Sequence, residues 1–289
     1  MSPQVSVIIT TFNRAAMVTE AVESVLAQEM MDSELIVVDD GSTDETEERL
    51  SDFDSRLKYY RQENAGVSAA RNRGLELSTT PLVAFLDSDD LWLPAKLRLQ
   101  HDYMTKHSEV YICQTEEVWW RDGRRVNPKK QHRKPSGDIF RRSLNLCLVS
   151  PSAVMMRREL FDKVGYFDED LPAAEDYDLW LRVSVEYAVP LLPDPLVIKR
   201  GGHSDQLSAR SGIDRYRIKA LEKLFKSARL SAEQYTWTWK VLRRKCEIYG
   251  QGCLKRGKVE EGQRYLALPE RYRHNLKETG DRSQESESK

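Results

Sequence analysis

The chain has 289 residues, which is enough for one large domain or two small ones with a sizeable core. Apolar residues make up 40% and charged residues 31%, as in ordinary globular proteins, and the net charge of -1 gives no global reason to expect binding to nucleic acid or to an anionic membrane. The four cysteines form no C-x-x-C pair and no zinc spacing, which favours a reduced, cytoplasmic protein over a disulfide scaffold.

Strands and helices are expected to alternate through the first 116 residues. The expected strands are continuous apolar or β-branched runs at 5–10, 34–40, 57–62, 82–86 and 110–116, and the expected helices cover 15–29, 41–50, 66–78 and 94–107. This alternation predicts βαβ units and a mainly parallel sheet, hence an α/β fold. The first run has no charged stretch before it and only strand length, so we interpret it as a core strand and not as a signal peptide.

A different pattern follows residue 116. Residues 121–142 are polar and strongly basic, which fits a solvated loop or irregular hairpin, or alternatively a loop that contacts an anionic acceptor or a lipid surface. Further on we expect a short strand and a helix within 152–169, a helix at 175–187, a strand at 194–200, charged helices over 212–270 and a disordered tail at 271–289. No apolar segment approaches the roughly 18 residues that would span a bilayer.

Carboxylates gather where the expected strands end. Asp39 and Asp40 follow the second strand, and Asp87, Asp89 and Asp90 follow the fourth. In open α/β sheets ligands bind beyond these carboxyl ends, where unpaired carboxylates would repel one another unless a divalent cation joined them. The cluster therefore predicts a metal, and the metal predicts a phosphate-bearing ligand. The alternative is that Asp89 or Asp90 caps the next helix and the others are solvated.

A basic counterpart lies in the segment "ENAGVSAARNRG". A glycine at a helix N-terminus, Gly66, with Arg71 and Arg73 nearby suits an anion, although surface arginines on an amphipathic helix are the alternative. The chain has no G-x-G-x-x-G after the first strand and no G-x-x-x-x-G-K-[ST], which disfavours dinucleotide dehydrogenases and P-loop NTPases.

Five segments together resemble the family 2 glycosyltransferases. They are "VSVIITTFNR", "ELIVVDDGSTDET", "NAGVSAARNRGL", "VAFLDSDDLWLPAKL" and "AAEDYDLWLRVS", in the order and spacing of that family, and the match covers roughly residues 3 to 205. The resemblance implies an inverting, nucleotide-sugar-dependent enzyme with the GT-A fold, whose Rossmann-like, mainly parallel sheet is flanked by helices. It divides the chain into a nucleotide-sugar-binding half at 1–117, an acceptor-binding and catalytic half of the same domain at 118–211, and a helical C-terminal extension at 212–270.

The resemblance also implies the residues on the donor side. Thr11 and Asn13 are expected at the nucleotide, Asp39 is expected to read the nucleobase, usually uracil, and Arg71 is expected beside the base and diphosphate. The donor is then most simply a UDP-sugar.

The D-x-D motif of the family matches residues 87–89. Asp87 and Ser88 are expected to contact the donor, and Asp87 and Asp89 the cation, Mn²⁺ or Mg²⁺, with Asp89 as the more direct ligand. This cation would neutralise charge on the departing diphosphate.

On the acceptor side, Asp176 resembles the catalytic base and Glu175 its neighbour in the acceptor site. A helix begins at this point, and its dipole would favour the ionised carboxylate that a base requires. Plain capping of that helix is the alternative.

Two further residues have open roles. His203 is expected to complete the metal shell or contact a phosphate, with a surface histidine as an equal alternative. Trp92 is a candidate for packing on the acceptor or donor sugar, but core packing is the favoured alternative.

Two other functions compete with glycosyl transfer. A nucleotidyltransferase that makes sugar nucleotides would need a glycine-rich basic loop after the first strand, where this chain has "TTFNRAAM". A non-catalytic sugar-nucleotide-binding protein would not need Asp89 and Asp176. We expect a cytoplasmic enzyme of polysaccharide or glycoconjugate synthesis that uses a glycan or lipid-linked acceptor and no nucleic acid. The basic loop 124–134 is the sequence feature that suggests peripheral contact with the inner face of a membrane.

Overall fold

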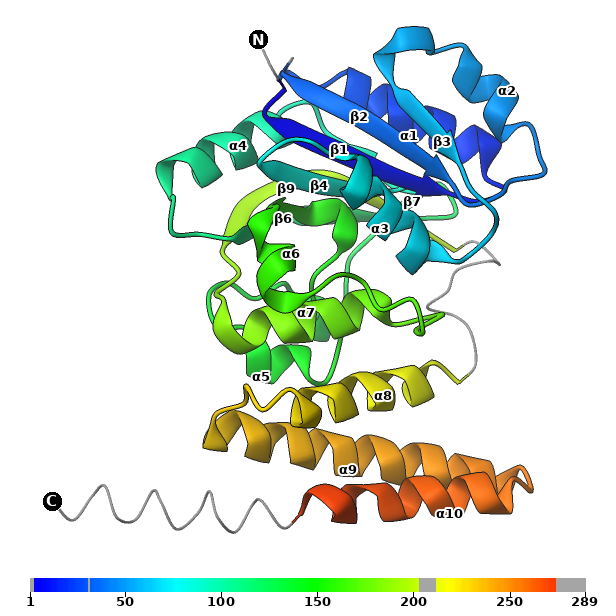
Figure 1. The fold of residues 1–289 in the computed structure, drawn as a ribbon, viewed down its shortest axis with the longest axis vertical. Coiled ribbons are helices and arrows are strands. Elements are labelled where there is room, and N and C mark those ends of the chain that lie inside the picture. The colour runs from blue at the N-terminus through cyan, green and yellow to red at the C-terminus, as the bar shows by residue number, and fades with distance from the viewer. Residues whose placement is uncertain (1–2, 31, 203–211, 274–289) are drawn as a thin grey trace, which may run out of the picture.

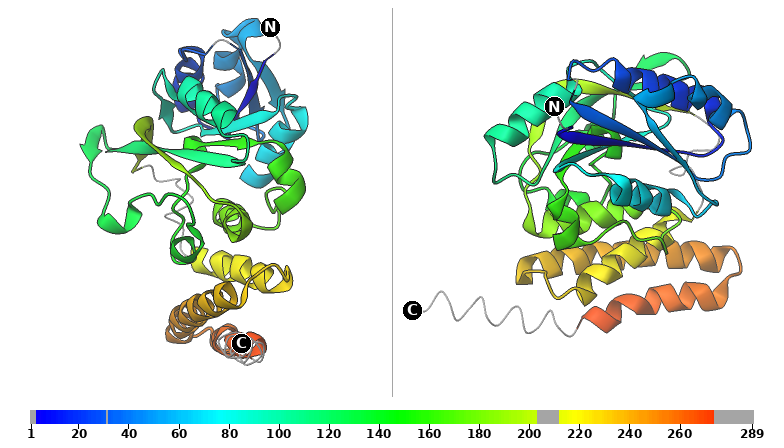
Figure 2. Two further views of the ribbon diagram at one scale, coloured as in Figure 1. Left: turned by 90° about the vertical axis from the view of Figure 1, so that its left-hand side faces the viewer. Right: turned by 45° about the horizontal axis from the view of Figure 1, so that its top comes forward.

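The computed structural model describes residues 3–30, 32–202 and 212–273 of the chain (Figure 1). Its described part contains one nine-stranded sheet with helices on both faces, and a layer of three helices below (Figures 1 and 2). The strand order is β3-β2-β1-β4-β8-β6-β9-β5, with β7 paired to β6. This is the α/β architecture with a helical C-terminal extension that the sequence predicts.

The first four strands are parallel and end at one edge of the sheet. They are β1 (Val5–Thr11), β2 (Ser33–Asp39), β3 (Lys58–Arg61) and β4 (Leu82–Asp87). Thr11 pairs with Asp39 across β1 and β2, and Thr10 pairs with Asp87 across β1 and β4. The polar residues that follow these strands are therefore neighbours, as their positions in the sequence predicted.

The remaining strands make the sheet more mixed than expected. They are β5 (Leu91–Trp92), β6 (Ile112–Arg121), β7 (Arg124–Val126), β8 (Val154–Arg157) and β9 (Leu191–Gly201). Strand β8 runs antiparallel between β4 and β6, whereas β9 is parallel to β6. The basic segment begins with a β6–β7 hairpin and continues through the 3-10 turn Lys130–His132 to α5 (Phe140–Ser143).

Side-chain alternation along the strands divides the core into two layers. One face is covered by α1 (Ala15–Leu26), α2 (Thr46–Ser51) and α4 (Lys96–Lys106), and the other by α3 (Val67–Leu77), α6 (Glu159–Val164) and α7 (Glu175–Glu186). In β1, Val7 and Ile9 pack toward α1, while Ile8 packs toward α3. A Cβ at Gly74 of α3 would lie 2.3 Å from Cγ2 of Ile8, so glycine permits this close approach. The 3-10 turns Asp54–Arg56 and Pro151–Ala153 complete this part.

The extension consists of α8 (Ile213–Lys226), α9 (Ala232–Lys255), α10 (Val259–Ala267) and the 3-10 turn Leu268–Tyr272. Helix α8 packs against α7, and α9 and α10 lie beyond it, away from the sheet (Figures 1 and 2). Buried Tyr177 and Leu181 of α7 share a core with Leu221 of α8 and Leu242 of α9, so the extension is continuous with the α/β domain. Within the described residues, none of the helices has the length and apolar character needed to cross a membrane.

Candidate active site

A cavity of about 830 Å³ opens at the carboxyl ends of β1 and β4. Its walls come from the loops after these strands, the N-termini of α3 and α7, strand β9 and the first turns of α8. Thr11, Asn13, Arg71, Asp87, Asp89 and Asp176 are among the lining residues. The volume is within the range of small-molecule sites, and the lining combines carboxylates with cations.

Arg71 connects the two sides of this cavity. Its Nη2 donates to Oδ1 of Asp87 at 2.8 Å and its Nη1 to Oε1 of Glu175 at 2.7 Å, while the guanidinium lies 5.1 Å from the ring centroid of Phe167. Burial alone would lower the pKa of Arg71, but the charges of Asp87 and Glu175 outweigh it and raise this pKa. The arginine therefore stays charged, and it fixes Asp87 relative to the start of α7.

Three carboxylates converge after β4. One oxygen from each of Asp87, Asp89 and Asp90 lies within 4.8 Å of the others. Asp89 pairs with Arg14 at 3.2 Å, and burial together with the charge of Asp87 raises the pKa of Asp89. Because hard divalent cations prefer such oxygen ligands, the donor set that faces the cavity fits Mn²⁺ or Mg²⁺.

Asp90 differs from the other two carboxylates because both of its oxygens accept hydrogen bonds, whereas Asp87 and Asp89 each contact an arginine, Arg71 and Arg14. Oδ2 accepts a hydrogen bond from Ser152 Oγ at 2.6 Å, and Oδ1 accepts one from the backbone N–H of Arg200 at 3.0 Å. Burial raises the pKa of Asp90 to about 8. Its geometry is that of a residue that ties the 87–90 loop to β9 and positions the other two.

Asp176 and Glu175 lie in the first turn of α7, opposite the β4 carboxylates. The preceding residue, Ala174, has the left-handed φ of 63°, a conformation that costs non-glycine residues on the order of 1 kcal/mol and that sets the entry into the helix. Oδ2 of Asp176 accepts a hydrogen bond from the thiol of Cys147 at 3.4 Å. Glu175 is buried, and burial followed by the charge of Asp176 raises its pKa, against the opposing effect of Arg71.

Lys199 on β9 is a lining residue that the sequence analysis did not identify. Its Nζ lies 3.1 Å from Oγ of Ser150. Burial alone would lower the pKa of Lys199, but the charges of several carboxylates, Glu117 and then Asp90 foremost, raise it. Arg71 and Lys199 are thus charged, and with Arg14, Arg200 and Arg217 they place cations among the acidic groups of the cavity.

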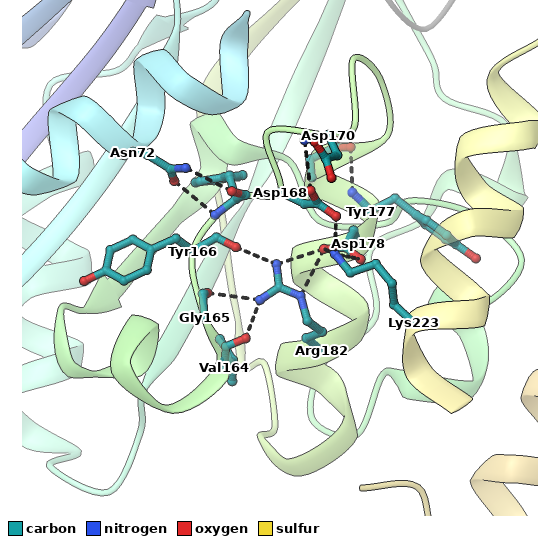
Figure 3. Close-up of polar contacts among 12 residues, drawn as sticks. Asn72, Val164, Gly165, Tyr166, Asp168, Asp170, Tyr177, Asp178, Arg182 and Lys223 are labelled. Atoms are coloured by element: carbon teal, nitrogen blue, oxygen red, sulfur yellow. Dashed lines mark hydrogen bonds and ion pairs between the residues drawn. The ribbon is translucent and has the colours of Figure 1, made fainter. Parts of the chain in front are cut away.

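A second layer of polar contacts holds α7 in place (Figure 3). Asp178 accepts hydrogen bonds from Arg182 at 3.0 Å and from Lys223 of α8 at 2.9 Å. Arg182 also donates to the carbonyl groups of Val164, Gly165 and Tyr166, and Lys223 donates to Asp168 at 2.6 Å (Figure 3). These contacts join the loop before α7 and helix α8 to the helix that carries Asp176.

The remaining donor-side residues of the sequence analysis lie at the same end of the sheet. Oγ1 of Thr11 is buried and has no hydrogen-bond partner among the described residues, and Ser88 lines the same cavity. Asn13 has a φ of 50°, and its Oδ1 accepts a hydrogen bond from the backbone N–H of Thr43 at 2.7 Å. This contact fixes the loop after β1 against the loop after β2.

Asp39, expected to read the nucleobase, is buried and already hydrogen-bonded. It has no exposed surface, and its Oδ1 accepts the Ser42 N–H at 2.8 Å while its Oδ2 accepts the Tyr59 hydroxyl at 2.6 Å. The adjacent Asp40 lines the cavity instead and accepts the N–H of Gly66 at 2.8 Å. Because neighbouring strand residues point to opposite faces, Asp40 shares the α3 face of the sheet and Asp39 does not.

Trp92 and Arg73 follow the structural alternatives that their positions in the sequence left open. Trp92 is only 3% exposed and its indole N–H donates to the carbonyl of Ser152 at 2.8 Å, so it belongs to the core and not to the acceptor site. Arg73 is an exposed arginine that pairs with Glu76, while Arg71 lines the cavity. His203 lies outside the described residues.

The chain is similar to known proteins in both sequence and fold. The family model described as "Glycosyl transferase family 2" matches residues 6–165. The WfgD protein of Escherichia coli, a UDP-Glc:alpha-D-GlcNAc-diphosphoundecaprenol beta-1,3-glucosyltransferase, is 32% identical over 184 residues, which cover 62% of this chain and 69% of WfgD. The TuaG protein of Bacillus subtilis, a putative teichuronic acid biosynthesis glycosyltransferase, is 32% identical over 63% of this chain and 72% of its own length.

Other similar proteins differ in length or are more distant. An uncharacterized glycosyltransferase of Rickettsia felis is 31% identical over 194 residues, and the match covers 64% of this chain but 31% of that protein. The chain therefore spans only about a third of the length of this relative. Among solved structures, TarS 1-349 of S. aureus in complex with UDP-GlcNAc has a TM-score of 0.72 at 21% identity and covers 92% of this chain and 79% of the TarS chain. This likeness supports the GT-A fold.

Proposed function

The chain belongs to glycosyltransferase family 2, and from this premise we propose that it transfers the sugar of a UDP-sugar to an acceptor hydroxyl, with inversion at the anomeric carbon. The choice of UDP is supported by the UDP-GlcNAc bound to TarS and by the UDP-Glc named for WfgD. The names of WfgD and TuaG support a glycan or lipid-linked sugar as the acceptor, in cell-surface polysaccharide synthesis.

One observation carries this proposal: carboxylates suited to a cation and a carboxylate suited to a base face the same cavity. Asp87 ends β4 and Asp89 follows it, Asp176 lies in the first turn of α7, and Arg71 contacts both Asp87 and the neighbour of Asp176. A sugar that bridges the two sides would have its diphosphate near the first group and its acceptor near the second.

The chemistry requires two tasks from the residues of the chain. As the acceptor oxygen bonds to the anomeric carbon, the bond from that carbon to the diphosphate breaks, and the diphosphate keeps the electron pair. Asp176 takes the proton of the acceptor hydroxyl as general base. Arg71 and Lys199 place positive charge beside the space for the diphosphate, where negative charge develops.

Asp87 and Asp89 are the residues that would hold Mn²⁺ or Mg²⁺, because both line the cavity with carboxylate oxygens within 4.8 Å of each other, whereas both oxygens of Asp90 accept hydrogen bonds. When bound, such a cation would act as a Lewis acid on the diphosphate oxygens. Asp39 remains our proposal for the residue that reads the nucleobase, and its hydrogen bond from the Ser42 N–H fixes the loop after β2.

We further propose a division of the chain that follows these roles. Residues 1–117 would bind the nucleotide sugar, residues 118–211 would bind the acceptor and supply the base, and residues 212–270 would add Ile213 and Arg217 to the wall of the cavity. The reaction would take place in the cytoplasm, at the inner face of a membrane if the acceptor is lipid-linked.

A nucleotide panel tests the proposed function. Thermal unfolding of the full chain is measured with UDP, ADP and GDP, each with and without Mn²⁺, and UDP release is then measured with a panel of UDP-sugars. We expect UDP with Mn²⁺ to raise the melting temperature most, because a ligand that binds only the folded state stabilises it. Pyrophosphate release from a nucleoside triphosphate and a sugar phosphate, without UDP release, would instead identify a nucleotidyltransferase.

A further inference from the structure

The overall net charge conceals a strong segregation of charge along the chain. Residues 212–273 contain 16 lysines and arginines and seven aspartates and glutamates, which gives a net charge of +9. Residues 1–211 contain 26 lysines and arginines and 35 aspartates and glutamates, which gives a net charge of -9. The positive part coincides with helices α8 to α10. The helical extension is thus a basic layer attached to an acidic domain.

Helix α9 presents its share of this charge on one outer stripe. Its buried residues, Thr238, Leu242, Cys246, Gly250 and Cys253, recur at helical spacing and face its neighbours. The opposite side of the helix is exposed and carries Lys240, Arg243, Arg244, Ile248 and Lys255, together with Gln251 and the acidic Glu247. We refer to the first five residues as the α9 stripe.

The cations of the α9 stripe are available for an external partner. Among the described residues, Lys240, Arg243, Arg244 and Lys255 form no ion pair, whereas Lys245 on the flank pairs with Asp214 at 3.8 Å. Arg243 lies 5.1 Å from the ring centroid of Trp239, a cation–π contact that involves no acidic group. Four unpaired cations on one helix face create a positive surface along a helix of 24 residues, about 36 Å long.

An apolar side chain lies among these cations. Ile248 is 58% exposed, the most exposed large hydrophobic residue in the described part of the chain. A lipid bilayer offers both partners that such a stripe needs: anionic headgroups for the lysines and arginines, whose stems are apolar, and an acyl boundary for the isoleucine. A polyanion such as nucleic acid would leave Ile248 without a partner.

We propose that the α9 stripe docks the protein on the surface of an anionic lipid bilayer. The inference goes beyond the proposed transfer reaction and does not depend on it. It is separate from the basic loop 124–134, in which Lys134 is buried against Glu117 at 2.9 Å while Arg124, Arg125 and Lys129 are exposed. Because α8 of the same extension lines the cavity through Ile213 and Arg217, docking would hold the site near the membrane.

Vesicle co-sedimentation of the full chain tests this proposal. Binding is measured on phosphatidylglycerol–phosphatidylcholine vesicles and on pure phosphatidylcholine vesicles. The wild type is compared with the stripe triple variant Lys240→Gln/Arg243→Gln/Arg244→Gln and with Ile248→Gln. The matched control is the triple variant Arg124→Gln/Arg125→Gln/Lys129→Gln. We expect binding only to the anionic vesicles, at least an about tenfold loss for the stripe triple variant, and less than about a twofold loss for the control. Ile248→Gln should weaken binding and make it more sensitive to salt.

Several outcomes would overturn the proposal. The first is that the folded wild type does not bind anionic vesicles. The second is that the stripe and control triple variants lose vesicle binding equally. The third is that the stripe variants lose binding to an oligonucleotide but still bind vesicles. Thermal melts check that each variant is folded. The substituted positions of the α9 stripe lie outside the cavity, so UDP release in solution should be unchanged in these variants. A failure of docking is therefore distinguishable from a failure of the proposed function.

Discussion

Nη1 of Arg71 lies 2.7 Å from Oε1 of Glu175, although the two residues are 104 positions apart in the chain. Both side chains are 6% exposed, so this is a buried ion pair. The other terminal nitrogen of the same guanidinium contacts Asp87. One arginine thus sets the distance between the carboxylates proposed for the donor and those proposed for the acceptor, because its planar fork contacts both at once.

Arg71→Lys is expected to keep the charge but lose the bridge, since one ammonium group cannot replace two directed N–H donors. Loss of one charged hydrogen bond costs about 1.5–3 kcal/mol, so kcat/KM for sugar transfer should fall roughly 10- to 100-fold. Steady-state kinetics measure the effect, and Arg73→Lys on the exposed face of the same helix is the matched control. Unchanged kinetics in Arg71→Lys would show that the bridge has no role in catalysis.

Asp89→Asn is expected to remove the advantage that Mn²⁺ gives to UDP binding. The amide is a weaker ligand for a hard cation than the carboxylate, so UDP affinity with Mn²⁺ should drop to that of the EDTA-treated wild type, at least about tenfold. Isothermal titration with and without Mn²⁺ measures this difference. Asp102→Asn, an exposed carboxylate on α4, should behave as wild type. A wild-type response to Mn²⁺ in Asp89→Asn would exclude this residue as a ligand.

The buried pair of Glu117 and Lys134 predicts a specific loss of stability in acid. Burial alone would raise the pKa of Glu117, but the charges of Lys134 and Lys199 outweigh it and lower this pKa to about 2, from 4.5. The folded state then binds fewer protons than the unfolded state between pH 4.5 and 2, so stabilisation by this carboxylate is complete above pH 4.5 and is lost as the pH falls to 2. This lowering of the pKa corresponds to about 3 kcal/mol of stabilisation of the folded state at neutral pH.

Urea unfolding of the wild type and of Glu117→Gln across this pH range checks the linkage. The difference between their free energies of unfolding should be largest near pH 7 and should vanish near pH 2, because the amide of the substituted side chain does not titrate. Glu109→Gln, at an exposed site on the same domain, supplies the comparison. A difference that is independent of pH would show that the pair acts through packing and not through charge.

Much of the fold could be predicted from the sequence because hydrophobic periodicity is a local property. The runs that became β1, β2 and β4 are apolar on both faces, as buried parallel strands require, and their ends meet as expected. The antiparallel placement of β8 between β4 and β6 could not be predicted in the same way. Strand direction within a sheet depends on how distant segments pair, which the pattern of a single segment does not contain.

The site was predictable in outline but less so in its details. Residues 87–89, Arg71 and Asp176 line one cavity, and of the two aspartates after β2 it is Asp40, which had no assigned role, that lines it. Alternation along β2 held the missing signal, because Val37 packs in the α1 layer and Val38 in the α3 layer. The placement of Lys199 depends on the pairing of β9 with β6, and its carboxylate neighbours come from distant segments.

The central claim is that Asp176 acts as the base while the opposite side of the cavity holds the donor, and Asp176→Asn tests it most directly. UDP-sugar binding and UDP release to an acceptor are measured for this variant, for wild type and for Asp162→Asn, an exposed residue on α6. We predict that Asp176→Asn binds UDP-sugar as the wild type does but loses about 10²- to 10⁴-fold in turnover. Turnover equal to that of the wild type, with binding intact, would contradict the account.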